Sequence, residues 1–449
     1  MIILKNGTLV TPSGAKAGDL AMEDGKILRI EDHIQPGPED SVFDVTGCIV
    51  FPGFIDGHTH LDLVNALGRT ADNFETGTQA AVCGGTTTCL DFATQEKGDT
   101  LVHTLAVWKD LAQNVSCNYG IHMSITDWNE RTKAEIQTMR DEGITTYKTY
   151  MAYDIAIDDV ATMEVLKELK TVGGVCGVHC ENGAMIPALQ QKLLSEGITG
   201  PTGHPLSHPA EIEAEAINRL CYLAAMADAP VHVVHLSSRL GLEEVRAARK
   251  RGQTVYAETC PQYLLFEDSV YARPDGSKFV LSPPIRKPED VAAIREAVLS
   301  GEIGTISTDH CPFNFTLKQS QAAKGFHQIP GGGAGVEHRP TLMLTHFKDD
   351  LSYTQLCDLL STNAAKLFHL YPKKGALQPG SDADIAVWDP NCKWVISAAN
   401  QHQNVDHTPY EGFEAAGRMK YVFVNGQLAV RDGEPTGVRA GEFVRTDCF

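Results

Sequence analysis

Six side chains that can bind metal ions follow or lie within β-rich runs of the sequence. They are His58, His60, Lys148, His179, His235 and Asp309. His58 and His60 form an H-x-H pair, and because side chains alternate along a strand, both imidazoles lie on one face. Taken alone, each residue also has a structural explanation, such as a core histidine or an aspartate that caps a helix. Together, at the ends of five predicted strands, they predict a metal site.

The run HVVH contains a second histidine, His232, three residues before His235. In a regular strand these two side chains point to opposite faces. We therefore expect at most one of them to face the barrel interior.

Lys148 lies in the middle of the run TTYKTYM. The free energy lost when an unpaired ammonium is buried exceeds the free energy gained from burying the aliphatic part of the lysine side chain. Lys148 is therefore exposed, paired or chemically changed. The four histidines and Asp309 could bind two divalent ions, but ions about 3.5 to 4 Å apart need an anionic bridge. A neutral lysine can react with carbon dioxide to give a carboxylate-like carbamate. The charge balance therefore predicts that Lys148 is carboxylated.

Parallel βα units are predicted for the middle of the chain, where apolar β-rich runs alternate with stretches of helical periodicity. The eight runs cover residues 48–60, 86–93, 119–126, 145–151, 174–180, 230–237, 253–259 and 304–310. Amphipathic helices are expected at residues 101–114, 160–172, 211–227 and 288–299. This pattern predicts an α/β fold with a (β/α)8 TIM barrel, whose chemistry lies at the carboxyl ends of the strands. A doubly wound sheet is the alternative.

Both ends of the chain have short alternating runs punctuated by turn residues, as in IILKNGTLV and YVFVNGQLAV. This pattern is typical of antiparallel hairpins. We expect residues 1–51 and 373–449 to form one smaller β-sandwich domain with a C-terminal tail, and residues 52–372 to form the catalytic barrel.

The composition limits the classes of molecule that the protein is expected to bind. A formal net charge of −19 over 449 residues disfavours nucleic acid and anionic membranes, which need basic patches. A small neutral substrate is expected instead. Without a signal core or a membrane-spanning window, the chain is expected to be cytoplasmic. The 12 cysteines include no CxxC pair, so we expect most to be buried thiols.

Several motifs resemble those of the hydantoinase and dihydropyrimidinase family, the cyclic amidohydrolases of the amidohydrolase superfamily. They are FPGFIDGHTHLD, DNFETGTQAAVCGGTTTCLDFA, YKTYMAY, VHCENG, VVHLSS, ETCPQYLLF, LSPPIR, STDHCPF and GVEHR. The resemblance covers nearly the whole chain. It implies two zinc ions bridged by a carboxylated lysine on the barrel, a β-sandwich built from both termini, and a homotetramer or dimer.

The same resemblance implies a role for each site residue. The ligands would be His58 and His60 for the more buried ion, His179 and His235 for the other, Lys148 as the bridge, and Asp309 as the last ligand and proton shuttle. Tyr153 would stabilise the oxyanion, although it could equally be packing at the barrel rim, and Ser282 would contact the substrate ring through its backbone. Gly331 stands where relatives have an asparagine that holds the ring amide.

The implied reaction is attack by a hydroxide shared by two metal ions on the ring amide of 5-substituted hydantoins or dihydropyrimidines, which gives N-carbamoyl amino acids. Allantoinase or dihydroorotase activity is the alternative within the enzymes, and a metal-free scaffold is the alternative from another class. Apolar residues in the loops after strands one and four either line the pocket for the 5-substituent or belong to the core. They are Leu63, Val64, Tyr150, Ile155 and Ile157.

Overall fold

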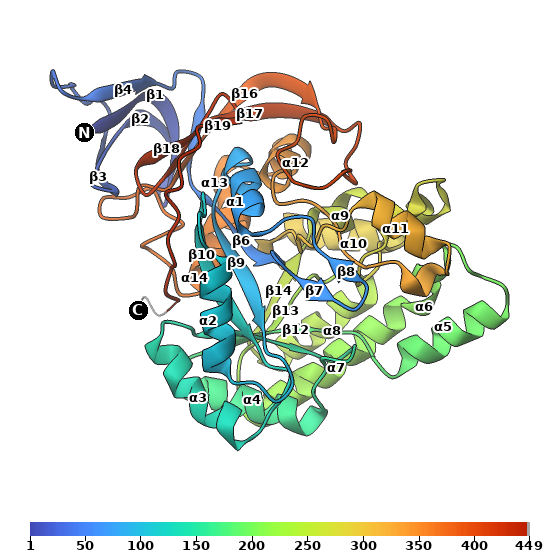
Figure 1. Cartoon of the computed structure of the whole chain (residues 1–449). Coiled ribbons are helices and arrows are strands. Elements are labelled where there is room, and N and C mark those ends of the chain that lie inside the picture. The colour runs from blue at the N-terminus through green and yellow to red at the C-terminus, as the bar shows by residue number, and fades with distance from the viewer. Residues whose placement is uncertain (447–449) are drawn as a thin grey trace.

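An eight-stranded parallel sheet forms the centre of the computed structural model, which describes residues 1–446 (Figure 1). Its strands are β6 (Phe54–Thr59), β9 (Thr86–Thr94), β10 (Asn118–Ser124), β11 (Thr146–Tyr150), β12 (Val175–His179), β13 (Val231–Val233), β14 (Val255–Thr259) and β15 (Thr305–Ile306). They pair in chain order, and each corresponds to one of the eight predicted runs.

The sheet closes between its first and last strands. Thr59, at the end of β6, forms a parallel bridge with His310, just beyond β15. The fully buried guanidinium of Arg339 donates hydrogen bonds of 2.7 Å to the carbonyls of Ile55 and Ile306, one on each strand. These contacts join β6 to β15, so the predicted TIM barrel is confirmed and the doubly wound sheet is excluded.

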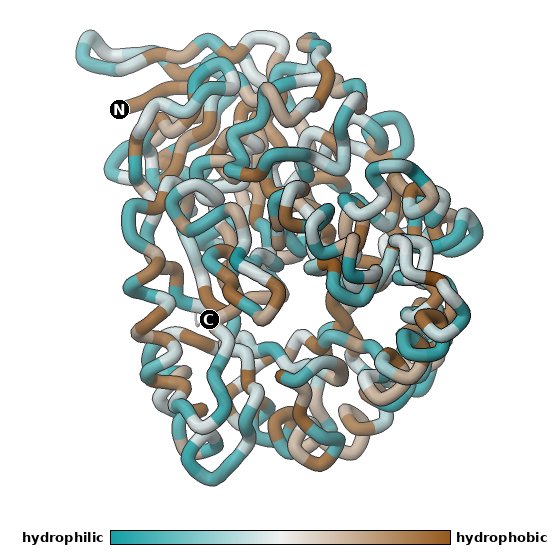
Figure 2. Tube along the Cα trace, turned by 45° about the vertical axis from the view of Figure 1, so that its right-hand side comes forward, coloured by the Kyte–Doolittle hydropathy of each residue, from teal (hydrophilic) through white to brown (hydrophobic). Residues whose placement is uncertain are grey.

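Amphipathic helices surround the barrel, and their traces alternate between hydrophilic and hydrophobic residues in Figure 2. The longer ones are α1 (Phe74–Cys83), α2 (Leu101–Leu111), α3 (Glu130–Asp141), α4 (Asp159–Thr171), α5 (Met185–Ser195), α7 (Ala210–Ala227), α8 (Arg239–Lys250) and α10 (Pro288–Leu299). The shorter ones are α6 (Gly203–Ser207), α9 (Pro261–Leu265), α11 (Phe315–Ala322), α12 (Arg339–His346), α13 (Tyr353–Cys357) and α14 (Asn363–Leu367). Side-chain caps fix several starts, such as Asn129 before α3 and Asp158 before α4.

A second sheet combines strands from both ends of the chain beside the barrel (Figure 1). Its strands are β1 (Ile2–Thr11), β2 (Gly14–Glu23), β3 (Lys26–Glu31), β4 (Ser41–Asp44), β5 (Ile49–Pro52), β16 (Ile385–Val395), β17 (Glu414–Val424), β18 (Gln427–Arg431) and β19 (Glu434–Pro435). Leu20 of β2 and Phe423 of β17 are not on neighbouring strands but share one hydrophobic core. The sheet therefore folds over its own core, as predicted for a sandwich.

The run predicted as a single first strand is divided at Gly53. Residues before it form β5 in the terminal sheet, and residues after it form β6 in the barrel. A β-carbon at Gly53 would lie 1.9 Å from the Thr87 hydroxyl oxygen, so only glycine fits at this crossing.

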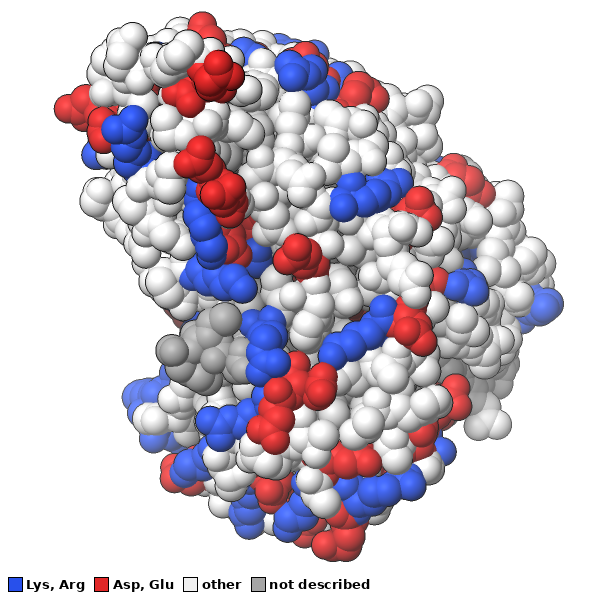
Figure 3. Space-filling model, turned by 60° about the vertical axis from the view of Figure 1, so that its left-hand side comes forward, with Lys and Arg blue, Asp and Glu red and all other residues white. Residues whose placement is uncertain are grey.

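The visible surface carries mixed charge. On the face shown in Figure 3, lysine and arginine side chains lie among aspartates and glutamates. The helices within residues 1–446 include none with the length and apolar character needed to cross a membrane.

Candidate metal centre

His58 on β6, His60 directly after that strand and Asp309 from beyond β15 meet at the carboxyl end of the barrel. Asp309 Oδ1 lies 3.2 Å from Nε2 of His58 and 3.1 Å from Nε2 of His60. Asp309 does not cap a helix, because the next helix, α11, begins at Phe315 with Asn314 before it. Hydrogen bonds from the backbone and side chain of Thr308 to Asp56 fix the chain just before Asp309.

A second histidine pair lies beside the first. His179 Nδ1 is 3.0 Å from His235 Nε2. The rings of His58 and His235 are 5.4 Å apart, and donor atoms of His58, His235 and Asp309 lie within 4.8 Å of one another. The predicted ligands from the first, fifth, sixth and eighth strands therefore form one cluster.

Two buried carboxylates that the sequence analysis did not assign orient this cluster. Glu258 lies 2.8 Å from Nδ1 of His58, and Glu181 lies 2.8 Å from Nε2 of His179. Burial alone would raise the pKa of each, but neighbouring histidines lower both to about 2, His58 acting on Glu258 and His208 and His179 on Glu181. Both side chains are therefore ionised hydrogen-bond acceptors.

These two hydrogen bonds decide where the imidazole lone pairs point. When His58 donates from Nδ1 and His179 donates from Nε2, the other nitrogen of each neutral ring presents a lone pair to the cluster. His58 Nε2 and the Asp309 carboxylate are then two acceptors that face each other across 3.2 Å, an arrangement that a cation between them stabilises. Imidazole nitrogens and carboxylate oxygens are ligands that zinc prefers, and a carboxylate behind a ligating histidine is the usual support. The donor set fits a divalent metal ion.

Lys148 is buried in β11, with 1% of its surface exposed. Its Nζ lies 4.8 Å from the ring centre of Phe92 and 5.3 Å from that of Tyr150, and it forms no salt bridge with a carboxylate of residues 1–446. Burial lowers its pKa to about 8. Its charge opposes protonation of both His58, whose pKa Asp309 and Glu258 nevertheless raise, and His235, whose pKa is lowered mainly by burial. Lys148 therefore lies near both histidine pairs. Of the three states considered for Lys148, the structure excludes exposure and pairing with a carboxylate.

Asp309 is ionised in this setting. Burial alone would raise its pKa, but His58 and His60 beside it hold that pKa well below its usual value. The carboxylate is therefore charged and available to a metal ion.

The three predicted substrate-binding residues lie next to this cluster. The Tyr153 ring is 5.2 Å from His179, and its hydroxyl donates a hydrogen bond of 3.2 Å to Glu181. Burial of the hydroxyl and the charge of Glu181 raise the pKa of Tyr153 well above its usual value, and Ser282 is also within hydrogen-bonding reach. A β-carbon at Gly331 would lie 3.7 Å from the Ser282 hydroxyl oxygen, so these two residues are neighbours.

Three site residues have left-handed backbones. The φ angles are 72° at Tyr153, 38° at His235 and 55° at Asp309. Such conformations cost about 1 to 3 kcal/mol each for residues other than glycine and cluster at functional sites. The left-handed turn at His235 follows β13, which ends at Val233.

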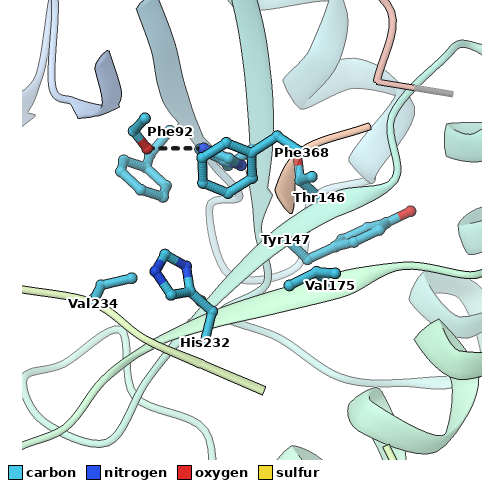
Figure 4. A pocket seen from close by; sticks show the side chains of 10 residues that line it. Phe92, Thr146, Tyr147, Val175, His232, Val234 and Phe368 are labelled. Atoms are coloured by element: carbon cyan, nitrogen blue, oxygen red, sulfur yellow. Dashed lines mark hydrogen bonds between the residues drawn. The ribbon is translucent and has the colours of Figure 1, made fainter. Parts of the chain in front are cut away.

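This turn makes the expectation for the HVVH run wrong, because both histidines point into the barrel. His232 lines a small interior cavity with Phe92, Val234 and Phe368 (Figure 4). The cavity, of about 10 Å³, holds at most one water molecule, and its lining residues precede the site residues along their strands. A substrate must therefore bind at the rim, where Tyr153 and Ser282 lie.

The apolar loop residues differ in their exposure. Val64 is 66% exposed on the hairpin of β7 (Val64–Asn65) and β8 (Gly68–Arg69), whereas Tyr150 is buried beside Lys148. Ile157 packs partly against the main core and lines an outer hollow of about 380 Å³ with Asp158 and Arg219. Leu63 and Ile155 are half-buried.

Comparisons with known proteins identify the family. The sequence profile of the amidohydrolase family matches residues 49–429. The chain is 38% identical to a D-hydantoinase of Ralstonia pickettii over 442 residues, which is 97% of this chain and 96% of the relative. It is 37% identical to a D-phenylhydantoinase of Escherichia coli strain SE11, with 100% of this chain and 98% of the relative covered.

Solved structures of similar proteins have the same fold. A dihydropyrimidinase from Brevibacillus agri superposes with a TM-score of 0.97 at 37% identity, covering 100% of this chain and 99% of the other. An L-hydantoinase from Arthrobacter aurescens superposes with a TM-score of 0.90 at 28% identity, covering 99% of each chain. The family is metal-dependent, in agreement with the donor set described above. The chain belongs to the amidohydrolase family, within the group of hydantoinases and dihydropyrimidinases.

Proposed function

We propose that this enzyme hydrolyses the ring amide of 5-substituted hydantoins or dihydropyrimidines and releases N-carbamoyl amino acids. The observation that carries the proposal is the single cluster of imidazoles and carboxylate at the barrel rim, with lone pairs directed inward by Glu258 and Glu181. Relatives that match over nearly the full chain are named hydantoinases, which supports a cyclic amide as the substrate.

We propose that this cluster would hold two divalent ions and that these ions are zinc. His58 and His60 would bind one ion, and His179 and His235 the other. Carboxylated Lys148 would bridge them, because a buried amine close to both histidine pairs and without a carboxylate partner is placed to supply the bridging anion. Asp309 would complete the set.

When bound, the ions lower the pKa of a water molecule towards neutrality and polarise the amide carbonyl. Asp309, which is ionised beside His58 and His60, accepts a proton at its carboxylate and returns it to the leaving ring nitrogen. Tyr153 keeps its hydroxyl proton because its pKa is raised, so with substrate bound the hydroxyl turns from Glu181 and donates its hydrogen bond to the oxygen that becomes negative.

Ser282 and Gly331 would hold the ring amide through their main chain. The backbone N–H and C=O groups of both residues make no hydrogen bond with other parts of residues 1–446. An amide needs one donor and one acceptor in return, which two adjacent stretches of backbone can supply. At Gly331 this contact does not require the asparagine side chain that the family resemblance implies for this position.

A substrate panel tests the proposal. Purified protein loaded with zinc is incubated with dihydrouracil, both enantiomers of 5-phenylhydantoin, allantoin and dihydroorotate, with and without chelator, and the ring-opened products are measured. We expect turnover of the first two substrates that the chelator abolishes. Exclusive turnover of allantoin or dihydroorotate would assign the alternative activities, and absence of bound metal would assign the scaffold function. Both enantiomers are needed because D- and L-hydantoinases are among the relatives.

We also propose that the enzyme is a cytoplasmic homotetramer or dimer. Light scattering coupled to size-exclusion chromatography measures the assembly, and cell fractionation measures the location.

A further inference from the structure

Lys318 is a fully buried lysine that the proposed chemistry does not use. It lies on α11, its exposed fraction is 0%, and it forms no salt bridge within residues 1–446. An isolated buried ammonium is costly unless its donors are satisfied, so its hydrogen bonds identify what it stabilises.

All the hydrogen bonds that Lys318 Nζ makes within residues 1–446 go to main-chain carbonyls of two separate segments. Its Nζ lies 2.6 Å from the carbonyl oxygen of Gly332, 2.9 Å from that of Val280 and 3.4 Å from that of Lys278. Gly332 also donates its N–H to the Val280 carbonyl at 3.0 Å. Lys318 thus joins residues 278–280 to the glycine-rich loop 331–333.

These two segments continue directly into the proposed substrate contacts. Ser282 follows Val280 by two residues, and Gly331 precedes Gly332. The intervening carbonyl, that of Leu281, accepts a hydrogen bond of 2.7 Å from His204. The carbonyls around the contacts are thus occupied by Lys318 and His204, whereas the backbone groups of Ser282 and Gly331 have no partner in the described part of the chain.

The loop needs such support because it contains three consecutive glycines. Gly331, Gly332 and Gly333 have no side chains to pack, and glycine loses more backbone freedom on ordering than any other residue. On its other side the loop is held by the backbone, through the hydrogen bond from the Cys311 N–H to the Gly333 carbonyl.

We propose that Lys318 is a positioning residue that fixes Ser282 and Gly331 relative to each other, and so determines how tightly the ring amide binds. The inference rests on the proposed function for its effect on substrate. It assigns Lys318 no part in metal binding or proton transfer.

The hydrogen bonds by which Lys318 joins the two segments do not depend on its charge. Burial lowers the pKa of this lysine to about 7, and a neutral amine still has two N–H donors for the two short contacts. A variant that tests this role must therefore remove the N–H donors of Lys318, and not only its charge.

Lys318→Met removes every donor while keeping the length of the side chain. We expect KM for 5-phenylhydantoin to rise about 10-fold, because the two segments lose their shared donor, while kcat changes less and both metal ions are retained. Lys318→Gln keeps two N–H donors and should recover part of the loss. Lys324→Met, at an exposed lysine just beyond α11, is the matched control and should leave KM unchanged.

The proposal is overturned if KM in Lys318→Met equals that of the control. It is also overturned if KM rises while kcat and the metal content both fall to a similar extent. Hydrogen exchange provides a readout that needs neither activity nor a variant. In the unmodified metal-loaded protein, the backbone amides of peptides 276–283 and 329–336 should exchange with solvent at the same rate as those of α11. Different exchange rates for the two peptides would also overturn the proposal. If the unmodified enzyme turns over no cyclic amide, the proposed function fails while this exchange result still stands or falls by itself.

Discussion

Replacement of Glu181 by glutamine should weaken one metal site and spare the other. Glu181 is fully buried and accepts hydrogen bonds from His179 at 2.8 Å and from Tyr153 at 3.2 Å. Glutamine has nearly the same shape but no charge, and its amide can present a donor to His179 instead of an acceptor. The tautomer that directs the His179 lone pair to the cluster then loses its support.

The size of the effect follows from the geometry. A carboxylate behind a ligating histidine contributes 10- to 100-fold in metal affinity, or about 1.4 to 2.7 kcal/mol. The hydrogen bond at 2.8 Å between two buried groups belongs near the upper end of that range, because the lost acceptor cannot be replaced by water. Glu258 makes the same contact at 2.8 Å with His58, on the other pair of ligands.

Metal release against a chelator separates the two sites. Zinc-loaded protein is titrated with a chelator of known affinity, and the number of ions released is followed in each variant. In Glu181→Gln we expect one ion, held by His179 and His235, to leave 10 to 100 times more easily. Glu258→Gln should weaken the other ion, and Glu196→Gln, at an exposed glutamate, should change neither.

Equal loss of both ions in Glu181→Gln and Glu258→Gln would refute the pairing of each carboxylate with one site. Unchanged affinity in both variants would refute the orienting role itself.

Four further predictions concern Tyr153, Arg339, two buried histidines and Gly331. Tyr153→Phe should lower kcat about 100- to 1000-fold with both ions retained, because an oxyanion donor is lost, and normal turnover would contradict its role. Arg339→Met should lower the free energy of unfolding in urea by about 3 kcal/mol, since it leaves the carbonyls that join β6 and β15 without a donor; a change below about 1 kcal/mol would count against this closure. Burial lowers the pKa of His204 to about 3 and that of His407 to about 4, from 6.5 in the unfolded chain. Below pH 6.5 the unfolded chain therefore binds a proton at each histidine that the folded protein does not, which lowers the free energy of unfolding by about 1.4 kcal/mol per histidine and pH unit. The melting temperature should therefore fall between pH 6.5 and 5, and a constant value would oppose this. Gly331→Asn should fold normally, because a β-carbon there meets no atom closer than 3.7 Å, and should change KM more than kcat; unchanged KM for every substrate in the panel would argue against contact with the ring.

Local sequence patterns were sufficient to locate the strands and the ligand candidates. Alternation and helical periodicity are properties of neighbouring residues, so all eight barrel strands and the helices α2, α4, α7 and α10 were predicted within a few residues. The pattern failed where the backbone departs from regularity. At Gly53 one apolar run serves two sheets, and at His235 a left-handed turn brings both histidines of HVVH into the barrel.

Glu258, like Lys148, is a charged residue inside a buried strand. A carboxylate inside the run QTVYAET is a buried charge that requires a partner. That signal was present in the sequence, but the identity of the partner was not. His58 is 200 residues away and meets Glu258 only because β6 and β14 belong to one closed sheet.

The sequence by itself determined which residue types stand at the strand ends, since spacing along a strand decides the face on which a side chain lies. The tertiary structure alone decided which carboxylate orients which imidazole, how Arg339 closes the barrel and which loops Lys318 joins. Each of these is a hydrogen bond between groups far apart in the chain, so its existence depends on the distances that folding sets rather than on any local pattern.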